Sequence, residues 1–255
     1  MSCLMNKYKA DLHLHTVLSP CGDLDMSPTK LVIQAKRMGL KIIGISDHNS
    51  TKHAELISRL AKKEGIFVLC GAEITSKEEI HLLCFMPHPK SLKMLQRYID
   101  KYLIKTAHSP KNFGEQLLVN EHEEVVAEEE FLLINAIDRS INEISDFVID
   151  NGGIFIPAHI NRAAYSLLSQ LGVVPPDLVF HALEIYKYSP LNLVNEADYL
   201  KNITFIQSSD AHYIPDIGKA TTDFYMNKLC FSEVKMALAK EQGRYCEIQN
   251  QTKEI

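Results

Sequence analysis

The sequences KIIGISD at Lys41–Asp47 and IFVLCGAE at Ile66–Glu73 are apolar, β-branched runs that enclose a segment with helical spacing. Both runs have the length and composition of buried strands. The segment between them, about Lys52–Glu64, ends before Gly65, and glycine is a typical residue at a helix stop. A strand, a helix and a second strand in this order predict a unit of an α/β fold.

Five further strand-like runs continue this pattern along the chain. Helical segments lie between most of them, and one of these segments begins at Ser27-Pro28, a typical helix start, and stops at Gly39. Alternating strands and helices predict a parallel sheet, and the absence of a G-x-G-x-x-G loop favours a closed or nearly closed barrel over a dinucleotide-binding fold. The five runs are Ala10–Thr16, Glu79–Phe85, Gly153–His159, Ala182–Tyr186 and Ile203–Asp210.

The composition is that of a globular protein, with 46% apolar and 23% charged residues among 255. We expect a single domain over 1–255 with an insertion at about 87–127. A net charge of −5 provides no field that attracts nucleic acid, so tight polynucleotide binding is not expected. There is no apolar signal core, membrane-length run or C-x-x-C pair, so we expect a cytoplasmic protein with free thiols and no membrane partner.

The stretch from Pro87 to Ala127 interrupts the alternation of strands and helices. It runs into EHEEVVAEEE at Glu121–Glu130, which holds six glutamates. A cation site is one interpretation, but a solvated insertion is favoured because charge runs usually face water. A helix over Glu128–Asp150 is expected to follow and to pack on the core through Phe131, Ile134, Ile137, Ile141, Ile144 and Val148.

Residues of metal-binding type occur at the ends of most predicted strands. His13 and His15 lie two apart on one strand, so both side chains point to the same face. The ends of barrel strands converge on one mouth, where so many imidazoles and carboxylates need a cation. Because they exceed the ligands that one zinc, iron or manganese ion takes, we infer a cluster of two or three ions. The candidate ligands are His13, His15, His48, Glu73, His81, His159, Asp210 and His212.

The other histidines fit no such position. His53, His88, His108, His122 and His181 are expected to be exposed or in loops.

In their order along the chain, these motifs resemble those of the PHP (polymerase and histidinol phosphatase) family. The resemblance runs from Asp11 to about Gly218. It implies an α/β fold of the distorted (β/α)7 TIM-like barrel type, a trinuclear metal centre and a stand-alone metal-dependent phosphoesterase. The matching motifs are Asp11-Leu12-His13-Leu14-His15-Thr16, Ser46-Asp47-His48-Asn49, Gly71-Ala72-Glu73, Ile80-His81, Pro157-Ala158-His159 and Ser209-Asp210-Ala211-His212.

The resemblance also implies how the ligands divide among three ions. The first ion would be held by His13, His15, Glu73 and Asp210. Glu73 would bridge to a second ion held by His81 and His159, and a third would be held by His48 and His212.

One position departs from the pattern of the family. Pro20 stands where many relatives have an aspartate that ligates the third ion, and proline has no side-chain ligand. Asp23, or less readily Cys21 or Asp25, could substitute, or all three could be turn residues.

The implied reaction is hydrolysis of a small phosphomonoester or of a nucleotide or short-oligonucleotide phosphate. The expected nucleophile is a hydroxide that bridges two of two to three zinc, manganese or iron ions. Glu73, Asp210 and His212 are the candidate catalytic residues, with Asp210 or His212 as the acid for the leaving group. Arg162 follows His159 closely and suits bidentate binding of a phosphate, although a surface arginine that closes a loop is the simpler alternative.

Two rival functions remain open. An amidohydrolase-like metallohydrolase would normally carry a bridging lysine on a middle strand, where this chain has Glu73. A non-catalytic, metal-bound regulatory domain is supported only by Pro20. The substrate, the metal and the oligomeric state are left open by the sequence.

Overall fold

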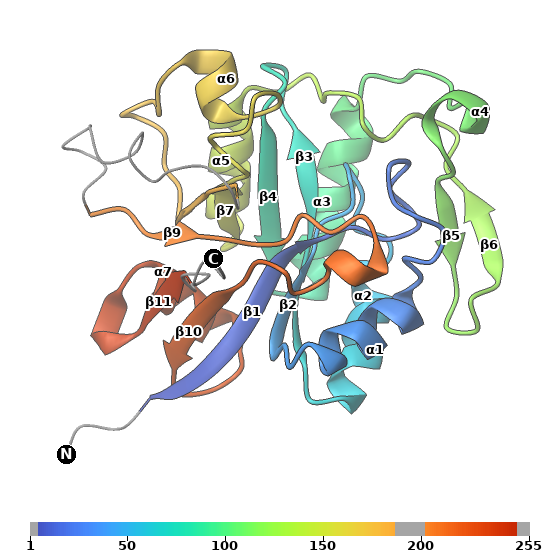
Figure 1. Ribbon diagram of the computed structural model, residues 1–255. Helices are drawn as coiled ribbons and strands as arrows, with labels where there is room; N and C mark the ends of the chain where they lie inside the picture. Colours follow the sequence, from blue (N-terminus) through green and yellow to red (C-terminus); the bar gives the residue numbers. More distant parts are fainter. Residues whose placement is uncertain (1–4, 187–201, 249–255) are drawn as a thin grey trace, which may run out of the picture.

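The computed structural model describes residues 5–186 and 202–248, and its main feature is a curled sheet of seven strands (Figure 1). The strand order is β11-β10-β1-β2-β3-β4-β7. The α/β fold expected from the sequence is therefore present. The strands are β1 (Asn6–Leu14), β2 (Ile42–Ile45), β3 (Phe67–Thr75), β4 (His81–Met86), β7 (Ile154–Pro157), β10 (Thr222–Met226) and β11 (Tyr245–Ile248).

The sheet is mixed, so the prediction of a parallel sheet is wrong for several strand pairs. Strands β1, β2 and β3 are mutually parallel, but β4 runs antiparallel to β3 and β7, and β10 runs antiparallel to β1 and β11. Only residues 76–80 join β3 to β4. A parallel crossover needs a dozen or more residues, so this connection can join only antiparallel neighbours.

Two more strands, β8 (Leu183–Glu184) and β9 (Phe205–Ile206), form a separate parallel pair. The described residues therefore show a curled half-barrel with this small parallel pair beside it, and a full (β/α)7 barrel is not confirmed. Backbone hydrogen bonds from His15 N to Ala211 O and from Ala211 N to His13 O attach the segment after β9 to the end of β1. These bonds bring the last predicted ligands beside the first.

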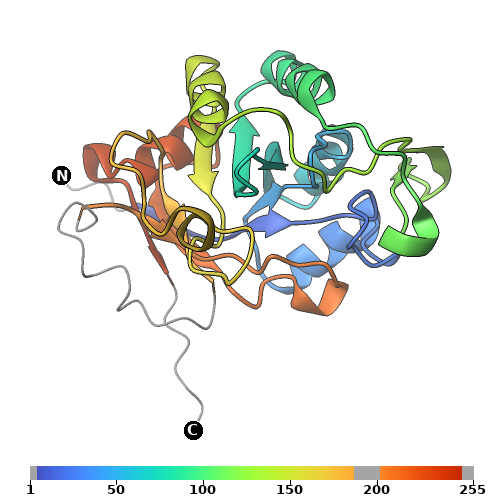
Figure 2. The same cartoon turned by 90° about the horizontal axis from the view of Figure 1, so that it is seen from above.

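Helices cover the sheet, and both faces of its strands β2, β3, β4 and β7 are largely buried. Neighbouring residues such as Ile42 and Ile43 are both fully buried but belong to two different apolar clusters. Helices α3 and α5 touch through the stacked rings of Tyr98 and Phe147, and Figure 2 shows them side by side. The helices are α1 (Pro28–Arg37), α2 (Ala54–Lys63), α3 (Pro89–Tyr102), α4 (Pro110–Phe113), α5 (Ile141–Asp150), α6 (Leu167–Leu171) and α7 (Phe231–Leu238).

The long helix predicted over 128–150 begins only at Ile141, which is a correction. Ser140 caps this helix: its hydroxyl accepts the N–H of Glu143, whose carboxylate accepts the N–H of Ser140. This reciprocal cap is a strong start signal inside the predicted range. The residues before it are extended or turn, and Phe131 forms a β-bridge with Ala107.

The predicted insertion is made of two unlike parts. Helix α3 buries Leu92, Leu95 and Ile99 in the larger core cluster, as a barrel helix does. The rest includes α4 and a hairpin of β5 (Leu117–Val119) and β6 (Val125–Glu128), and β6 is exposed throughout. No helix among the described residues is both long and apolar enough to cross a membrane.

Candidate metal centre

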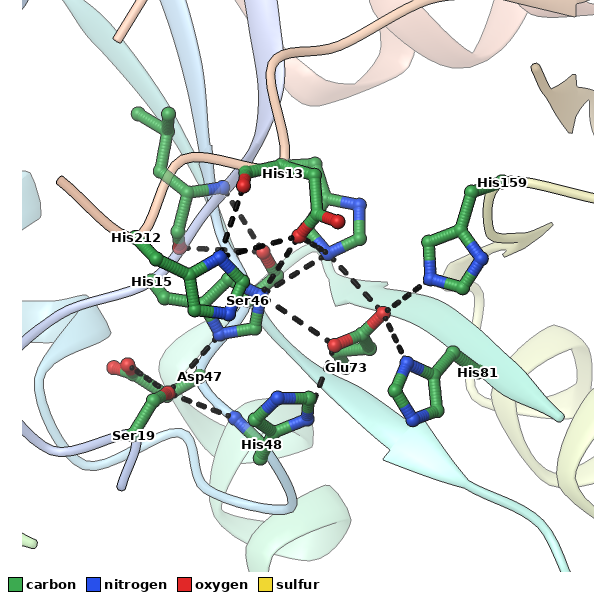
Figure 3. A network of polar contacts seen from close by, with 12 residues as sticks. His13, His15, Ser19, Ser46, Asp47, His48, Glu73, His81, His159 and His212 are labelled. Carbon is green, nitrogen blue, oxygen red and sulfur yellow. Dashed lines mark hydrogen bonds and ion pairs between the residues drawn. The ribbon is translucent and has the colours of Figure 1, made fainter. Parts of the chain in front are cut away.

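The eight predicted ligands come together at one end of the curled sheet. Figure 3 labels seven of them, all except Asp210. His13 lies in β1 and Glu73 in β3, and both are near the carboxyl ends of these strands. His81 is the first residue of β4, which runs antiparallel to β3 and so starts where β3 ends. The other ligands lie in loops that follow β1, β2, β7 and β9: His15, His48, His159, Asp210 and His212.

Glu73 is the centre of the cluster and is almost fully buried, with 1% exposure. Its Oε1 lies 3.0 Å from Nδ1 of His81, 3.1 Å from Nε2 of His13 and 3.3 Å from Nε2 of His159. Its Oε2 lies 3.0 Å from Nδ1 of His48 and 3.4 Å from Nε2 of His15. One carboxylate therefore faces five imidazoles, which is the arrangement expected of a bridging ligand.

Asp210 and His212 approach the same cluster from the opposite side. Oδ1 of Asp210 lies 3.4 Å from Nε2 of His13 and 3.5 Å from Nε2 of His15. The ring of His212 stacks on the ring of His15, with 4.2 Å between the centroids. Nδ1 of His212 donates to the carbonyl oxygen of Asp210 at 2.9 Å, so in the neutral ring the lone pair is on Nε2.

The protonation preferences in this cluster suit a metal site. Burial would raise the pKa of Glu73, but the surrounding histidines hold it well below its usual range. Burial lowers the pKa of His48 and His81, and it lowers that of His212 to about 4. At neutral pH these rings offer lone pairs and the carboxylate offers charge, which are the donors that divalent ions bind.

His13 differs from the other rings. Burial by itself would lower its pKa, but the carboxylates of Glu184, Glu73 and Asp210 raise it well above 6.5. A proton on Nε2 of His13 then lies between this nitrogen and Oε1 of Glu73, where a metal ion would otherwise neutralise the carboxylate. Metal binding at such a position displaces that proton.

Several donor atoms in the centre are buried without a hydrogen-bond partner among the described residues. They include Oε1 of Glu73, Nδ1 of His48, Nδ1 of His81 and both ring nitrogens of His159. Buried polar atoms are normally satisfied, so a cluster of orphaned ligand atoms indicates an ion. Three overlapping groups of ligand atoms lie within 4.8 Å of one another: His15, His48 and His212; His13, His15 and Glu73; and His48, Glu73 and His81. The residues therefore fit a metal cluster.

Backbone strain also concentrates here. His159 has a φ of 29° and Asp210 a φ of 51°, and Asn49 and Tyr165 are also left-handed, with φ of 45° and 54°. Non-glycine residues rarely adopt this conformation, and such strain is typical of functional sites. Tyr165 stacks its half-exposed ring on His81.

Glu184 belongs to the centre although the sequence analysis did not select it. It is buried, and its Oε2 lies 2.9 Å from Nδ1 of His13 and accepts the N–H of His159 at 3.0 Å. Such a carboxylate orients an imidazole so that its other nitrogen faces the ion. The available signal was a lone carboxylate in the apolar run Ala182–Tyr186, where an unpaired charge is unexpected.

The positions expected to complete the site lie at its open side. Asp23 is in a turn: its carboxylate accepts the N–H of Asp25 at 2.8 Å, and its own N–H donates to the carbonyl of His212. Nη1 of Arg162 lies 2.9 Å from Oδ2 of Asp210. A cavity of about 320 Å³ opens beside these groups and is lined by Cys21, Arg162, Tyr186, Ser209, Asp210, His212, Tyr213 and Asp216.

His53 lies in the turn before α2, as expected of a loop histidine, but only 1% of it is exposed. It immediately precedes α2 and makes two buried hydrogen bonds through its ring. Nothing in the local sequence distinguishes it from an exposed histidine near a helix start.

Comparisons with known proteins find a matching family model and similar structures. A family model described as the PHP domain matches residues 11–166. The uncharacterized protein YqxK of Bacillus subtilis is 23% identical over 271 aligned residues, which cover 94% of this chain and 64% of that protein. The chain thus spans less than two thirds of this curated relative.

Two solved structures share the fold. The lesion-specific endonuclease PfuEndoQ of Pyrococcus furiosus superposes with a TM-score of 0.73 at 17% identity, over 94% of this chain and 58% of that one. Endonuclease Q has also been solved with a 27-mer duplex that carries an abasic lesion at the active site. A proposed metal-dependent phosphoesterase of Bifidobacterium adolescentis has a TM-score of 0.58 at 18% identity and covers 91% of this chain and 96% of that one.

Proposed function

This chain belongs to the PHP domain family, and we propose that it is a metal-dependent phosphoesterase that hydrolyses small phosphomonoesters or the phosphate of a nucleotide or short oligonucleotide. The family and the structural neighbours support a metal-dependent hydrolase. The observation that carries the finer proposal is the position of Glu73 among five imidazoles beside an open cavity that holds an arginine.

In this proposal the centre holds two to three divalent ions of zinc, manganese or iron. His13, His15, Glu73 and Asp210 would hold one ion. His81 and His159 would hold a second together with Glu73, and His48 and His212 would hold the third. Asp23 is the weakest candidate ligand because its carboxylate already accepts a backbone N–H within its own turn. When bound, such ions acidify water and neutralise charge on phosphoryl oxygens.

The chain's own residues would bind the phosphate and manage the proton. Arg162 can grip two phosphate oxygens with its planar guanidinium if it leaves Asp210. Nearby histidines hold the pKa of Asp210 below its usual range despite burial, so this group is ionised at neutral pH. As an ionised group it has no proton to give, so it could act as the acid for the leaving group only after taking up a proton, which its lowered pKa disfavours. His212, whose pKa is lowered to about 4, is better suited to ligation than to acid catalysis.

The cavity limits the size of the substrate. Its volume of about 320 Å³ is near the lower end for small-molecule sites. Tyr186 lies under the Arg162 guanidinium, with 5.8 Å between the guanidinium carbon and the ring centroid, and Tyr213 is exposed on the same cavity. Aromatic walls beside a phosphate-binding arginine favour a phosphate ester that carries a ring, such as a nucleotide or the end of an oligonucleotide.

The test combines metal content with a substrate panel. Protein purified without chelator is analysed by ICP-MS and assayed with p-nitrophenyl phosphate, bis(p-nitrophenyl) phosphate, a mononucleotide and a cyclic amide. The proposal expects two or three transition-metal ions per chain and turnover of the phosphate esters only. Turnover of the cyclic amide alone would indicate an amidohydrolase, and full metal loading without turnover would indicate a regulatory domain. Protein without transition metal would remove the basis of the proposal.

A further inference from the structure

The hairpin β5–β6 is connected to the metal centre through a buried histidine. The backbone N–H of Val119, the last residue of β5, donates to Nε2 of His53 at 3.0 Å. On the other side of the ring, Nδ1 of His53 lies 2.7 Å from Oγ1 of Thr16. Thr16 directly follows the ligand His15, so His53 stands between the inserted hairpin and the first metal-binding motif.

The directions of these hydrogen bonds follow from chemistry. A backbone N–H can only donate, so Nε2 of His53 must carry the lone pair and Nδ1 the hydrogen. Burial also lowers the pKa of His53, which favours this neutral ring. Thr16 Oγ1 then accepts from His53 and donates its own hydrogen to the carboxylate of Asp47, whose oxygens lie 2.9 and 3.0 Å away.

The chain of hydrogen bonds continues from Asp47 to His15. Oγ of Ser19 donates to Oδ1 of Asp47 at 2.7 Å and accepts the backbone N–H of His48 at 3.2 Å. Oγ of Ser19 also lies 3.0 Å from Nδ1 of His15. Because the hydroxyl hydrogen is already donated to Asp47, Oγ accepts here, and Nδ1 of His15 carries the hydrogen. The lone pair of His15 is thereby placed on Nε2, the atom that faces Glu73 and Asp210.

We propose that His53 is a positioning residue that, through Thr16, Asp47 and Ser19, holds His15 in its metal-binding tautomer, and that the hairpin β5–β6 fixes His53. The inference rests on the metal centre of the proposed function. His13 has a direct carboxylate partner in Glu184, whereas His15 depends on this longer chain. The hairpin thus contributes to metal binding although it supplies no ligand.

The test measures cobalt binding, which reports on the ligands without requiring catalysis. The affinity for Co²⁺ and its visible absorption spectrum are measured for wild type, Thr16→Val and Thr16→Ser. Thr16→Val keeps the shape but removes the hydroxyl, and we expect Co²⁺ affinity to fall by about 10–100-fold with a shifted spectrum. Thr16→Ser restores the hydroxyl and should return both values toward wild type.

Thr204→Val is the matched control. Thr204 is also buried, and its hydroxyl donates to the carbonyl of Leu238 rather than toward the metal centre. This variant should lose stability with no change in Co²⁺ affinity or spectrum. If Thr16→Val behaves like Thr204→Val, His53 and Thr16 are structural only and the inference is overturned.

A pair of substitutions at His53 gives an independent test if Thr16→Val does not fold. His53→Asn keeps an N–H near the position of Nδ1 that can donate to Thr16, and His53→Leu does not. The inference expects weaker Co²⁺ binding in His53→Leu than in His53→Asn, and equal binding would overturn it. Wild type that binds Co²⁺ and hydrolyses phosphate esters while all variants match it would overturn this inference and leave the proposed function intact. Wild type that binds no Co²⁺ would overturn both.

Discussion

The two ends of the candidate metal centre are built differently. At the Glu73 end the ligands Glu73, His13 and His81 stand on strands β3, β1 and β4 and are almost fully buried. At the opposite end Asp210 and His212 stand on a loop, their side chains are 13% and 21% exposed, and they face the cavity. Ligands on a sheet are held by the whole core, whereas ligands on a loop depend on local hydrogen bonds. We therefore expect the ions that Glu73 would share with His13, His81 and His159 to be bound tightly, and the ion that His48 and His212 would hold to exchange more readily at the open end.

The largest effect on the metal centre is expected from Glu73→Gln. The neutral amide removes the charge that all five imidazoles face, so we expect loss of the ions at both ends and a fall in activity of at least about 100-fold. ICP-MS and phosphatase assays measure the two effects. Glu143→Gln, at an exposed helix cap, should change neither. Retention of two ions in Glu73→Gln would show that Glu73 is not the bridge.

Glu184→Gln examines the Glu73 end more finely. The amide can still meet Nδ1 of His13 but lacks the charge that orients and polarises the ring. We expect metal affinity to fall by about 10–100-fold, as measured by competition with a chelator. Unchanged affinity would mean that the carboxylate serves only to balance the charge of the ion-free protein.

His48→Ala separates the two ends by ion count. The variant should lose about one ion per chain by ICP-MS and keep the ions that Glu73, His13 and His159 hold. His122→Ala, at an exposed loop residue, is the control. Loss of every ion in His48→Ala would show that the centre loads cooperatively and that the two ends are not independent.

The pH dependence of stability sharpens the description of the open end. The pKa of His212 in the folded, metal-free protein is lowered from 6.5 to about 4, so the unfolded chain binds more protons between these values. Its contribution to stability is therefore present above pH 6.5 and is lost as pH falls toward 4, by at most about 1.4 kcal/mol per pH unit. Chemical denaturation of the metal-free protein at pH 7 and pH 4.5 should show a smaller loss in His212→Asn than in wild type. Equal losses of stability in the two proteins would show that His212 is solvated and that its pKa is not lowered in the folded state.

The smallest expected effect belongs to Arg162→Lys. Lysine keeps the charge but not the planar pair of donors, so kcat/KM for phosphate esters should fall about 10-fold, mainly through KM. Metal content should stay at the wild-type value. An unchanged KM would return Arg162 to the simpler interpretation of a surface residue that closes a loop.

The parts of this molecule that could be predicted from sequence are those encoded in local patterns. Buried strands such as β2 and β3 are continuous apolar runs, and the pair His13 and His15 has the period of a strand. The reversed direction of β4 was within reach of the sequence, because the short connection at 76–80 excludes a parallel crossover. Strands β10 and β11 were missed because pairing partners depend on distant residues. Glu184 and His53 were missed for the same reason, since their roles exist only in contacts with residues far away in the chain.

The charges in the centre have a consequence for the order in which the protein takes up its ligands. Glu73, Asp210 and Glu184 bring three carboxylates together around His13, and these carboxylates raise the pKa of His13 above its usual value. Before ions enter, the local field is negative and repels a phosphate; two divalent ions reverse its sign. Under the proposed function, metal loading would therefore have to precede substrate binding, and the metal-free protein would bind phosphate esters weakly.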